Sequence, residues 1–455
     1  MHPTELDALY AFLVAGAVTA LLTPLTMRFA RAVGAVDEPR ERGLSERSVP
    51  LLGGLAIFAG TLVAALIWLP ASEPSSGTGG GVLHWYGVFL AAGVITIVGA
   101  LDDRFDLNPI LKLAGQIVAA LIVVHYGVVV KDVAVPFVGL LQFPNEGGVI
   151  TVIGLVALMN IVNFSDGVDG LAAGVSAIIA LALVVIAISL YYEGHHLHSL
   201  APAVFAALIA GGALGFLVHN FPPASSFMGD CGANLLGLLM GVLAVEATVK
   251  TEIVISFVVP LILLTVPFLD TTFVVLKRVK YRRPIYASDS EHFHHRMARI
   301  GFTPRRTILY LYVWTLMLAG LALAVRFIPY SDHHGHFRTG WSLVLLALVL
   351  LVFAASVYLV YLLEILKFRR LATLRVRLLR PEASVEEVQR DVDRHLETGE
   401  MQVVSVPPAT RPRRPAASGT AAPAPAPAAS QQNGAGPITA RKQVDHTEPD
   451  RAARA

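Results

Sequence analysis

Long apolar runs separated by short polar segments dominate the first 370 residues of the chain. A helix of roughly 20 apolar residues crosses a bilayer core of about 30 Å. Eleven runs approach that length, several of them short and rich in glycine, so the pattern predicts an all-α polytopic membrane protein with about 10–11 transmembrane helices. The expected spans are Ala8–Ala30, Leu51–Leu69, Trp85–Leu101, Ile110–Val130, Val149–Asn163, Leu171–Tyr191, Leu200–His219, Ala233–Ala247, Ile253–Lys277, Thr307–Ile328 and Trp341–Leu366.

The distribution of Lys and Arg predicts the orientation, because short cytoplasmic loops retain positive charge. Segments after the first, third, ninth and last spans hold nearly all of these residues. We therefore expect an outside N-terminus, a cytoplasmic C-terminus and a place in the inner (plasma) membrane. The inner set includes Arg28, Arg31, Arg40, Arg42, Arg47, Arg104, Lys112, Lys277, Arg278, Arg305, Arg306, Lys367 and Arg369, and the opposite loops hold Lys131, Lys250, Arg326 and Arg338.

Three regions follow from these patterns. Residues 1–370 are expected to form the transmembrane domain. In residues 371–404, Val385, Val388 and Val392 recur at helical spacing amid charges, which predicts an amphipathic cytoplasmic segment. Residues 405–455 are rich in Ala, Pro, Gln and Gly and predict a disordered tail, because such a composition buries too little apolar surface to fold.

The composition supports the membrane class. Of the 455 residues, 55% are hydrophobic and 15% charged, whereas soluble domains carry about 25% charged residues. A net charge of +2 gives no reason to expect nucleic acid as a partner. The single cysteine, Cys231, excludes an intramolecular disulfide framework and a multi-cysteine metal cluster.

Acidic, Asn and His side chains gather on the cytoplasmic side of this topology. Carboxylates at the hydrocarbon boundary are costly unless they are paired or hold a cation. Each one alone is equally well a solvated interfacial residue, but the group predicts an active-site cleft at the cytoplasmic face. Its members are Asp37, Asp102, Asp103, Asn160, Asn163, Asp166, Asp169, Asp230, Asp270, His292, His294 and His295.

The first motif is LDDRFDLNPILKLAGQ, where adjacent Asp102 and Asp103 end the third span and Lys112 follows. Mg²⁺ prefers carboxylate oxygens together with substrate phosphates, so the pair and the lysine suit a metal and a phosphate. Taken alone, the same letters are better explained by an acidic turn after a helix, and only the other motifs favour the metal and phosphate site.

The second motif is NIVNFSDGVDGLAAG. Asn160, Asn163 and Asp166 are spaced by three, so a continuing helix places them on one face. Gly167 and Gly170 then permit a tight turn and a close approach to a ligand. An ordinary Asx/Gly turn accounts for the glycines but not for the two upstream Asn residues.

The third motif is PPASSFMGDCGANLLG, in which Asp230 stands just before an expected helix. It is either an N-cap or a carboxylate that holds a cation while the helix N-terminus faces a diphosphate.

The fourth motif is SDSEHFHHRMARIGFTPRR. Its three His suggest zinc, but they do not form a water-activating motif such as HExxH. Among many Arg and Lys, an anionic nucleotide sugar suits His292, His294 and His295 better.

Six segments of this chain, in this order, resemble those of the polyprenyl-phosphate N-acetylhexosamine-1-phosphate transferases, glycosyltransferase family 4. The segments are VDEPRERGLSERSVPLLGGLAI, LDDRFDLNPILKLAGQ, NIVNFSDGVDGLAAG, FMGDCGANLLG, VPFLDTTFVVLKR and the HFHH loop, within residues 37–306. The HFHHRM ending looks closer to the branch that starts O-antigen, teichoic acid and arabinogalactan-linker synthesis from UDP-N-acetylglucosamine. It is less similar to phospho-N-acetylmuramoyl-pentapeptide transferase of peptidoglycan synthesis, whose loop has a run of three His.

The resemblance implies a reaction and its partners. N-acetylglucosamine 1-phosphate, or a related N-acetylhexosamine 1-phosphate, passes from a UDP-sugar to polyprenyl phosphate and gives polyprenyl diphosphate sugar and UMP. This is the first membrane step of cell-envelope glycan synthesis. The implied cofactor is Mg²⁺, with Mn²⁺ as the alternative, and a homodimer is compatible with this reading.

The resemblance also implies roles for matching residues. The catalytic set is Asp102, Asp103, Asp230, His292, His294 and His295, and the metal ligands come from Asp230, Asp102, Asp103 and Asn163. Substrate binding falls to Asp37, Arg42, Lys112, Asn160, Asn163, Asp166, Asp169, Asp270 and Arg296.

One loop departs from the family, which usually has Lys and His where this chain has Gly43 and Ser45. Losing two charges that face a diphosphate puts that loop's role in question. Other classes stay open: the pentapeptide transferase within the family, a secondary transporter, whose charges usually lie near the midplane, and a scaffold, which needs no such polar cluster.

Overall fold

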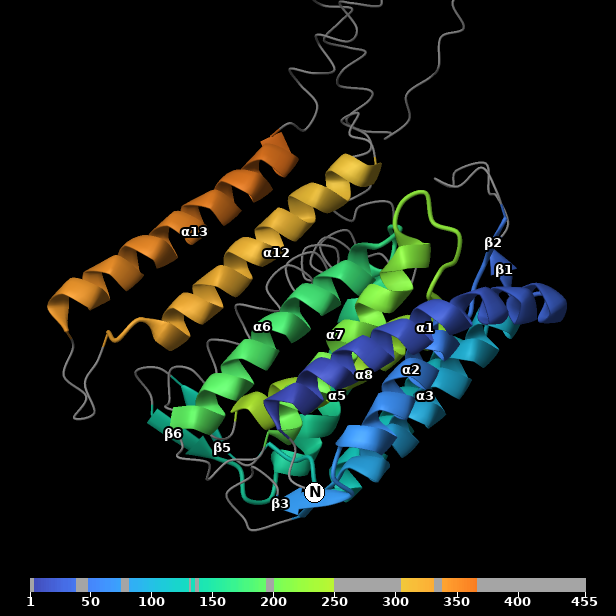
Figure 1. Cartoon of the computed structure of the whole chain (residues 1–455), viewed down its shortest axis with the longest axis horizontal. Coiled ribbons are helices and arrows are strands. Elements are labelled where there is room, and N and C mark those ends of the chain that lie inside the picture. Colours follow the sequence, from blue (N-terminus) through green and yellow to red (C-terminus); the bar gives the residue numbers. More distant parts are fainter. Residues whose placement is uncertain are drawn as a thin grey trace, which may run out of the picture. The chain divides into compact units, whose positions relative to one another are not determined.

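The computed structural model describes residues 4–37, 48–74, 82–130, 132–135, 139–193, 200–248, 304–330 and 338–365 (Figure 1). The predicted span Ile253–Lys277 and the segments 371–404 and 405–455 lie outside the described residues, so their structure stays a prediction.

Each of the other ten predicted spans overlaps a helix. The helices are α1 (Glu5–Val33), α2 (Gly53–Trp68), α3 (Trp85–Phe105), α4 (Pro109–His125), α5 (Gly147–Ser165), α6 (Leu171–Glu193), α7 (Ala201–Asn220), α8 (Gly229–Thr248), α12 (Pro304–Phe327) and α13 (Thr339–Ile365). Within the described ranges, eight of them are long and apolar enough to cross a membrane, while α2 and α4 are shorter apolar helices of 16 and 17 residues. The prediction of a helical, polytopic membrane protein is confirmed.

Three short hairpins were not expected from the sequence. The antiparallel pairs are β1 (Val36–Asp37) with β2 (Val49–Pro50), β3 (Ser72–Pro74) with β4 (Val82–His84), and β5 (Asp132–Val135) with β6 (Gly139–Gln142). Each strand has four residues or fewer, which is too short for an alternating apolar and polar pattern to predict a strand.

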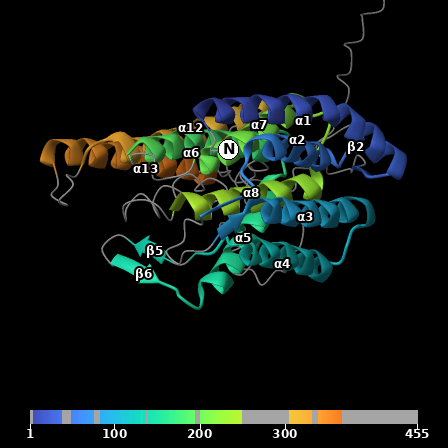
Figure 2. The same ribbon diagram turned by 60° about the horizontal axis from the view of Figure 1, so that its bottom comes forward.

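Helices α7 and α8 lie within the packed interior. Helix α7 contacts α1, α2 and α6, and α8 packs between α3 and α5 (Figures 1 and 2). Their apolar side chains are largely buried, whereas other helices expose large apolar residues such as Leu21, Leu66 and Ile110. Exposed apolar side chains of this kind suit contact with lipid rather than water.

Glycines let three helices meet closely where α8 begins. A Cβ added to Gly54 of α2 would lie 2.2 Å from the backbone N of Gly232 in α8. One added to Gly99 of α3 would lie 2.4 Å from the Cα of Cys231. Because real Cβ atoms do not approach backbone atoms this closely, the backbone contact itself requires glycine and fixes where the first turn of α8 sits.

We expect Gly54→Ala to lower the free energy of unfolding by about 1–3 kcal/mol, because the added methyl group must push α2 and α8 apart. The apparent melting temperature in detergent measures this effect. Gly154→Ala in α5 is the matched control, since a Cβ there meets nothing within 4 Å, and it should melt no lower than the wild type. Equal melting temperatures for the two variants would contradict the packing argument.

Candidate active site

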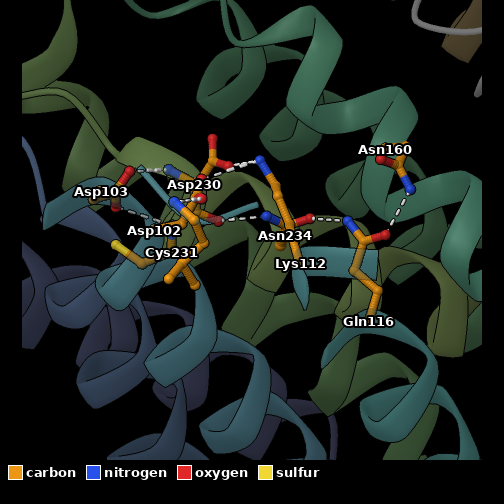
Figure 3. A network of polar contacts seen from close by, with 9 residues as sticks. Asp102, Asp103, Lys112, Gln116, Asn160, Asp230, Cys231 and Asn234 are labelled. Atoms are coloured by element: carbon orange, nitrogen blue, oxygen red, sulfur yellow. Dashed lines mark hydrogen bonds and ion pairs between the residues drawn. The ribbon is translucent and has the colours of Figure 1, made fainter. Parts of the chain in front are cut away.

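Asp102, Lys112 and Asp230 form an ion-pair cluster at one end of three helices (Figure 3). The Lys112 Nζ lies 3.3 Å from Asp102 Oδ2 and forms a second ion pair with Asp230 Oδ2. The side chains are 14–22% exposed, so water reaches the cluster only in part. Two carboxylates around one ammonium leave a net negative centre at the end of a membrane helix bundle.

Local sequence explains how α4 delivers Lys112 to this position. The Asn108 side chain accepts a hydrogen bond of 2.9 Å from the Ile110 N–H and starts α4, with Pro109 at its first position. Asp102 Oδ1 accepts from the Leu107 N–H at 3.0 Å, which ties the end of α3 to the same turn. Lys112 therefore lies in the first turns of α4, facing Asp102.

Asp103 holds the N-terminus of α8. Its carboxylate accepts from the N–H groups of Asp230 and Cys231 at 2.7 and 3.2 Å. Gly229 adopts a φ of +68°, and a Cβ there would lie 2.3 Å from Asp103 Oδ2. The sequence placed Asp230 just before the helix, but these bonds allow α8 to begin at Gly229, so Asp230 lies in its first turn. Asp103 thus positions the backbone that carries Asp230.

The turn between α5 and α6 is bound to the loop before α8. Asp169 Oδ2 accepts from the Ala224 N–H at 2.9 Å. Asn220 accepts from the Gly170 N–H at 2.8 Å and donates to the Ser226 carbonyl at 2.9 Å. Burial raises the pKa of Asp169, and the Ala224 N–H opposes that rise. The segment 221–228 is therefore fixed on the side that faces residues 166–170.

Asp166 lies just beyond the last residue of α5, so the predicted helical face holds only as far as Ser165. Its carboxyl is partly buried, and its pKa is raised well above the usual 3.8. The main cause is removal from water, followed by the negative charges of Asp103 and Asp169. Asp166 therefore belongs to the same acidic region as Asp103.

We expect Asp166→Asn to raise the melting temperature at pH 7 in the absence of divalent cations, and to change it little at pH 4. A carboxyl with a raised pKa holds its proton more tightly in the folded state, so folded stability falls as the pH rises from about 4 toward the raised pKa. The Asn side chain does not ionise in this range, so the variant does not lose stability in this way as the pH rises. Thermal unfolding of variant and wild type at both pH values tests this. If the melting temperature of the variant relative to the wild type is no higher at pH 7 than at pH 4, the pKa of Asp166 is not raised by folding.

Two buried amides were missed by the sequence analysis. Gln116 Nε2 donates to Asn234 Oδ1 at 2.8 Å, and Asn160 Nδ2 donates to Gln116 Oε1 at 2.8 Å (Figure 3). The available signal was spacing, because Gln116 lies four residues after Lys112 and Asn234 four after Asp230. Polar residues one turn apart share a helix face.

Asp37 and Asn163 border this region. Asp37 pairs with Val49 in the β1–β2 hairpin, and the next hairpin residue, Pro50, accepts from the Phe227 N–H at 3.0 Å. Asn163 is partly buried in the last turn of α5. The remaining predicted site residues lie outside the described residues: Arg42, Asp270, His292, His294, His295 and Arg296, together with Gly43 and Ser45.

The donor chemistry of the cluster fits a magnesium ion. In the part of the chain that the structure describes, no three His, Cys, Asp or Glu side chains form a ready metal cage. The Asp102 and Asp230 carboxylates instead approach one common cation, the Lys112 ammonium. Mg²⁺ is usually held by one or two carboxylates plus substrate phosphates and waters, so this two-carboxylate set suits it.

The residues that build this site fall within a stretch similar to known proteins. The sequence profile of glycosyl transferase family 4 matches residues 85–248, from α3 through α8. The probable undecaprenyl-phosphate N-acetylglucosaminyl 1-phosphate transferase of Bacillus subtilis is 33% identical over 67% of this chain and 80% of its own length. The decaprenyl-phosphate N-acetylglucosaminephosphotransferase of Mycobacterium leprae is 34% identical over 70% and 83%.

A third relative, the undecaprenyl-phosphate alpha-N-acetylglucosaminyl 1-phosphate transferase of Escherichia coli K12, is 27% identical over 77% of this chain and 88% of its own. The two more similar relatives exceed 30% identity and are matched over most of their length. The acidic cluster, the helical architecture and these similarities agree, and the chain belongs to glycosyl transferase family 4.

Proposed function

We propose that this protein transfers N-acetylglucosamine 1-phosphate from UDP-N-acetylglucosamine to polyprenyl phosphate, giving polyprenyl diphosphate N-acetylglucosamine and UMP. The observation that carries the proposal is the Asp102–Lys112–Asp230 cluster, which lies inside the stretch matched by the family. The relatives named above bear names of polyprenyl-phosphate N-acetylglucosamine-1-phosphate transferases.

The reaction is a phosphoryl transfer. An oxygen of polyprenyl phosphate attacks the β-phosphorus of the donor, the bond from that phosphorus to the bridging oxygen breaks, and UMP leaves with the electron pair. A phosphate monoester is mostly dianionic near pH 7, since its second pKa is about 6, so the nucleophile needs little help from a base. Positioning and charge neutralisation then carry most of the catalysis.

The cluster suits both tasks. Asp102 and Asp230 would hold Mg²⁺, which neutralises charge on the diphosphate and polarises the reacting phosphorus when bound. Lys112 forms ion pairs with the same two carboxylates in this structure. With those carboxylates holding the ion, Lys112 would be available to bind the phosphate oxygens of the substrate. Asp103 would keep Asp230 in place through the N-terminus of α8.

The site would face the cytoplasm. Basic residues lie at the same ends of the helices as the cluster: Arg31 at the end of α1, Arg104 at the end of α3 and Arg305 at the start of α12. Positively charged segments stay on the cytoplasmic side. On this proposal the N-terminus is outside and both substrates meet at the inner face of the plasma membrane.

Release of UMP by detergent-purified protein tests the proposal. The assay supplies polyprenyl phosphate and Mg²⁺ with UDP-N-acetylglucosamine, UDP-N-acetylgalactosamine, UDP-glucose or UDP-N-acetylmuramoyl-pentapeptide. We expect release with UDP-N-acetylglucosamine that a chelator abolishes. Release with the pentapeptide donor alone would assign the protein to peptidoglycan synthesis instead, and folded protein that releases UMP from no donor would refute the transferase reading.

A further inference from the structure

A chain of three amide side chains links helices α5, α4 and α8 beside the ion-pair cluster (Figure 3). Asn160 of α5 donates to Gln116 of α4, which donates to Asn234 of α8. Asn234 Nδ2 then donates to the backbone carbonyl of Asp230 at 2.8 Å. The chain therefore ends on the residue that forms an ion pair with Lys112.

This chain is buried and directional. Gln116 and Asn234 are each 1% exposed, so water cannot take over their bonds. Gln116 uses its oxygen toward Asn160 and its nitrogen toward Asn234, which fixes the orientation of its amide. Loss of one member leaves buried polar groups without partners, which is costly, so the helices are held at the spacing that satisfies all three.

Lys112 and Gln116 lie one turn apart on the same face of α4. Both reach toward α8, Lys112 to the Asp230 carboxylate and Gln116 to Asn234. The body of α4 packs mainly against α3 and α5. The side chains of Lys112 and Gln116 are thus two polar links between α4 and α8. The Lys112 link is an ion pair that bound substrate and metal would alter, whereas the Gln116 link is a hydrogen bond between uncharged amides.

We propose that Gln116 is a positioning residue, which through Asn234 holds Lys112 and Asp230 in register for the transfer reaction. Its role in catalysis rests on the proposed function, whereas its effect on Lys112 does not. If bound substrate and metal drew Lys112 away from Asp230, the amide chain would still join α4 to α8 and keep their spacing. Asn160 of α5 donates a hydrogen bond to the Gln116 oxygen and so fixes the other end of the Gln116 amide.

Two measurements on Gln116→Met, which keeps the length of the side chain but loses both hydrogen bonds, test the proposal. The first is the rate at which acetic anhydride labels Lys112, followed by mass spectrometry in the absence of substrate. Labelling of Lys112 should rise several-fold, because the ammonium leaves its two carboxylates more often, while the other lysines react as before. The second is UMP release, where kcat should fall about tenfold to a hundredfold with KM changed much less.

Rescue separates positioning from a general loss of structure. Gln116→Asn shortens the link by one methylene, and Asn234→Gln in the same protein restores that length from α8. The double variant should label and turn over closer to the wild type than Gln116→Asn alone. Thr315→Val is the control, since it removes a buried hydroxyl whose 2.8 Å bond lies within α12.

Folded Gln116→Met or Gln116→Asn protein with wild-type labelling of Lys112 and wild-type kcat would overturn the proposal, as would a double variant no better than Gln116→Asn. Labelling needs no turnover. If the wild type released no UMP, the proposed function would fail, and the labelling rates would still decide whether Gln116 positions Lys112.

Discussion

Replacing Asp230 by Asn is expected to lower the rate of UMP release by about a hundredfold to a thousandfold, on the scale of losing one preorganised electrostatic group. Asn has nearly the same shape, and the backbone N–H of residue 230 still donates to Asp103. The change therefore removes one negative charge while it leaves the start of α8 in place. That charge forms an ion pair with Lys112 here and would hold the metal ion during the reaction.

The matched control is Asp106→Asn. Asp106 is exposed at the end of α3, and its φ of 51° is a conformation that Asn tolerates well. It should melt and turn over as the wild type does. An Asp230→Asn protein that keeps more than a tenth of the activity would remove Asp230 from the centre of the mechanism.

Replacing Lys112 by Met is expected to lower kcat by about a hundredfold, because a charge that faces the diphosphate is lost. Lys112→Arg should keep more activity, since it retains the charge, although its planar group fits the space between two carboxylates differently. Both rates come from the same UMP assay at saturating donor.

Lys112→Met should also change how much Mg²⁺ raises the melting temperature. Without the ammonium, Asp102 and Asp230 face each other unneutralised, so Mg²⁺ should raise the melting temperature of the variant more than that of the wild type. A variant in which Mg²⁺ raises the melting temperature no more than in the wild type would show that Lys112 does not offset the charge of these carboxylates. A variant with wild-type kcat would show that the charge of Lys112 is not needed for the transfer.

The sequence predicted those parts of the protein that depend on local pattern. A run of about 20 apolar residues has few alternatives to a membrane helix, so the helices were identified from hydropathy alone. The sequence also identified Asp102, Lys112 and Asp230. Charged side chains at the ends of apolar runs are costly unless they are paired or hold a ligand. The structure brings these three side chains together, although Asp230 lies more than a hundred residues from the other two.

What the sequence did not predict depends on contacts between distant segments. Gln116 and Asn234 look like single polar residues inside apolar helices, but the fold joins them by a 2.8 Å hydrogen bond across 118 residues. From the sequence, Asp102 and Asp103 were expected to share one role. In the fold Asp103 accepts hydrogen bonds from the N-terminus of α8, whereas Asp102 pairs with Lys112. Helix α8 begins at Gly229, earlier than expected, and Asp103 from a distant helix accepts from the N–H groups of its first turn.

The fate of the β-phosphorus tests the central claim most directly. Purified protein is given polyprenyl phosphate, Mg²⁺ and UDP-N-acetylglucosamine labelled with ³²P at the β-phosphate, and the lipid and water phases are counted separately. Transfer of sugar 1-phosphate predicts that the label enters the lipid phase, with one UMP released for each labelled lipid. Label that stays in the water phase as UDP while the sugar enters the lipid would show transfer of the sugar alone, and would contradict the account.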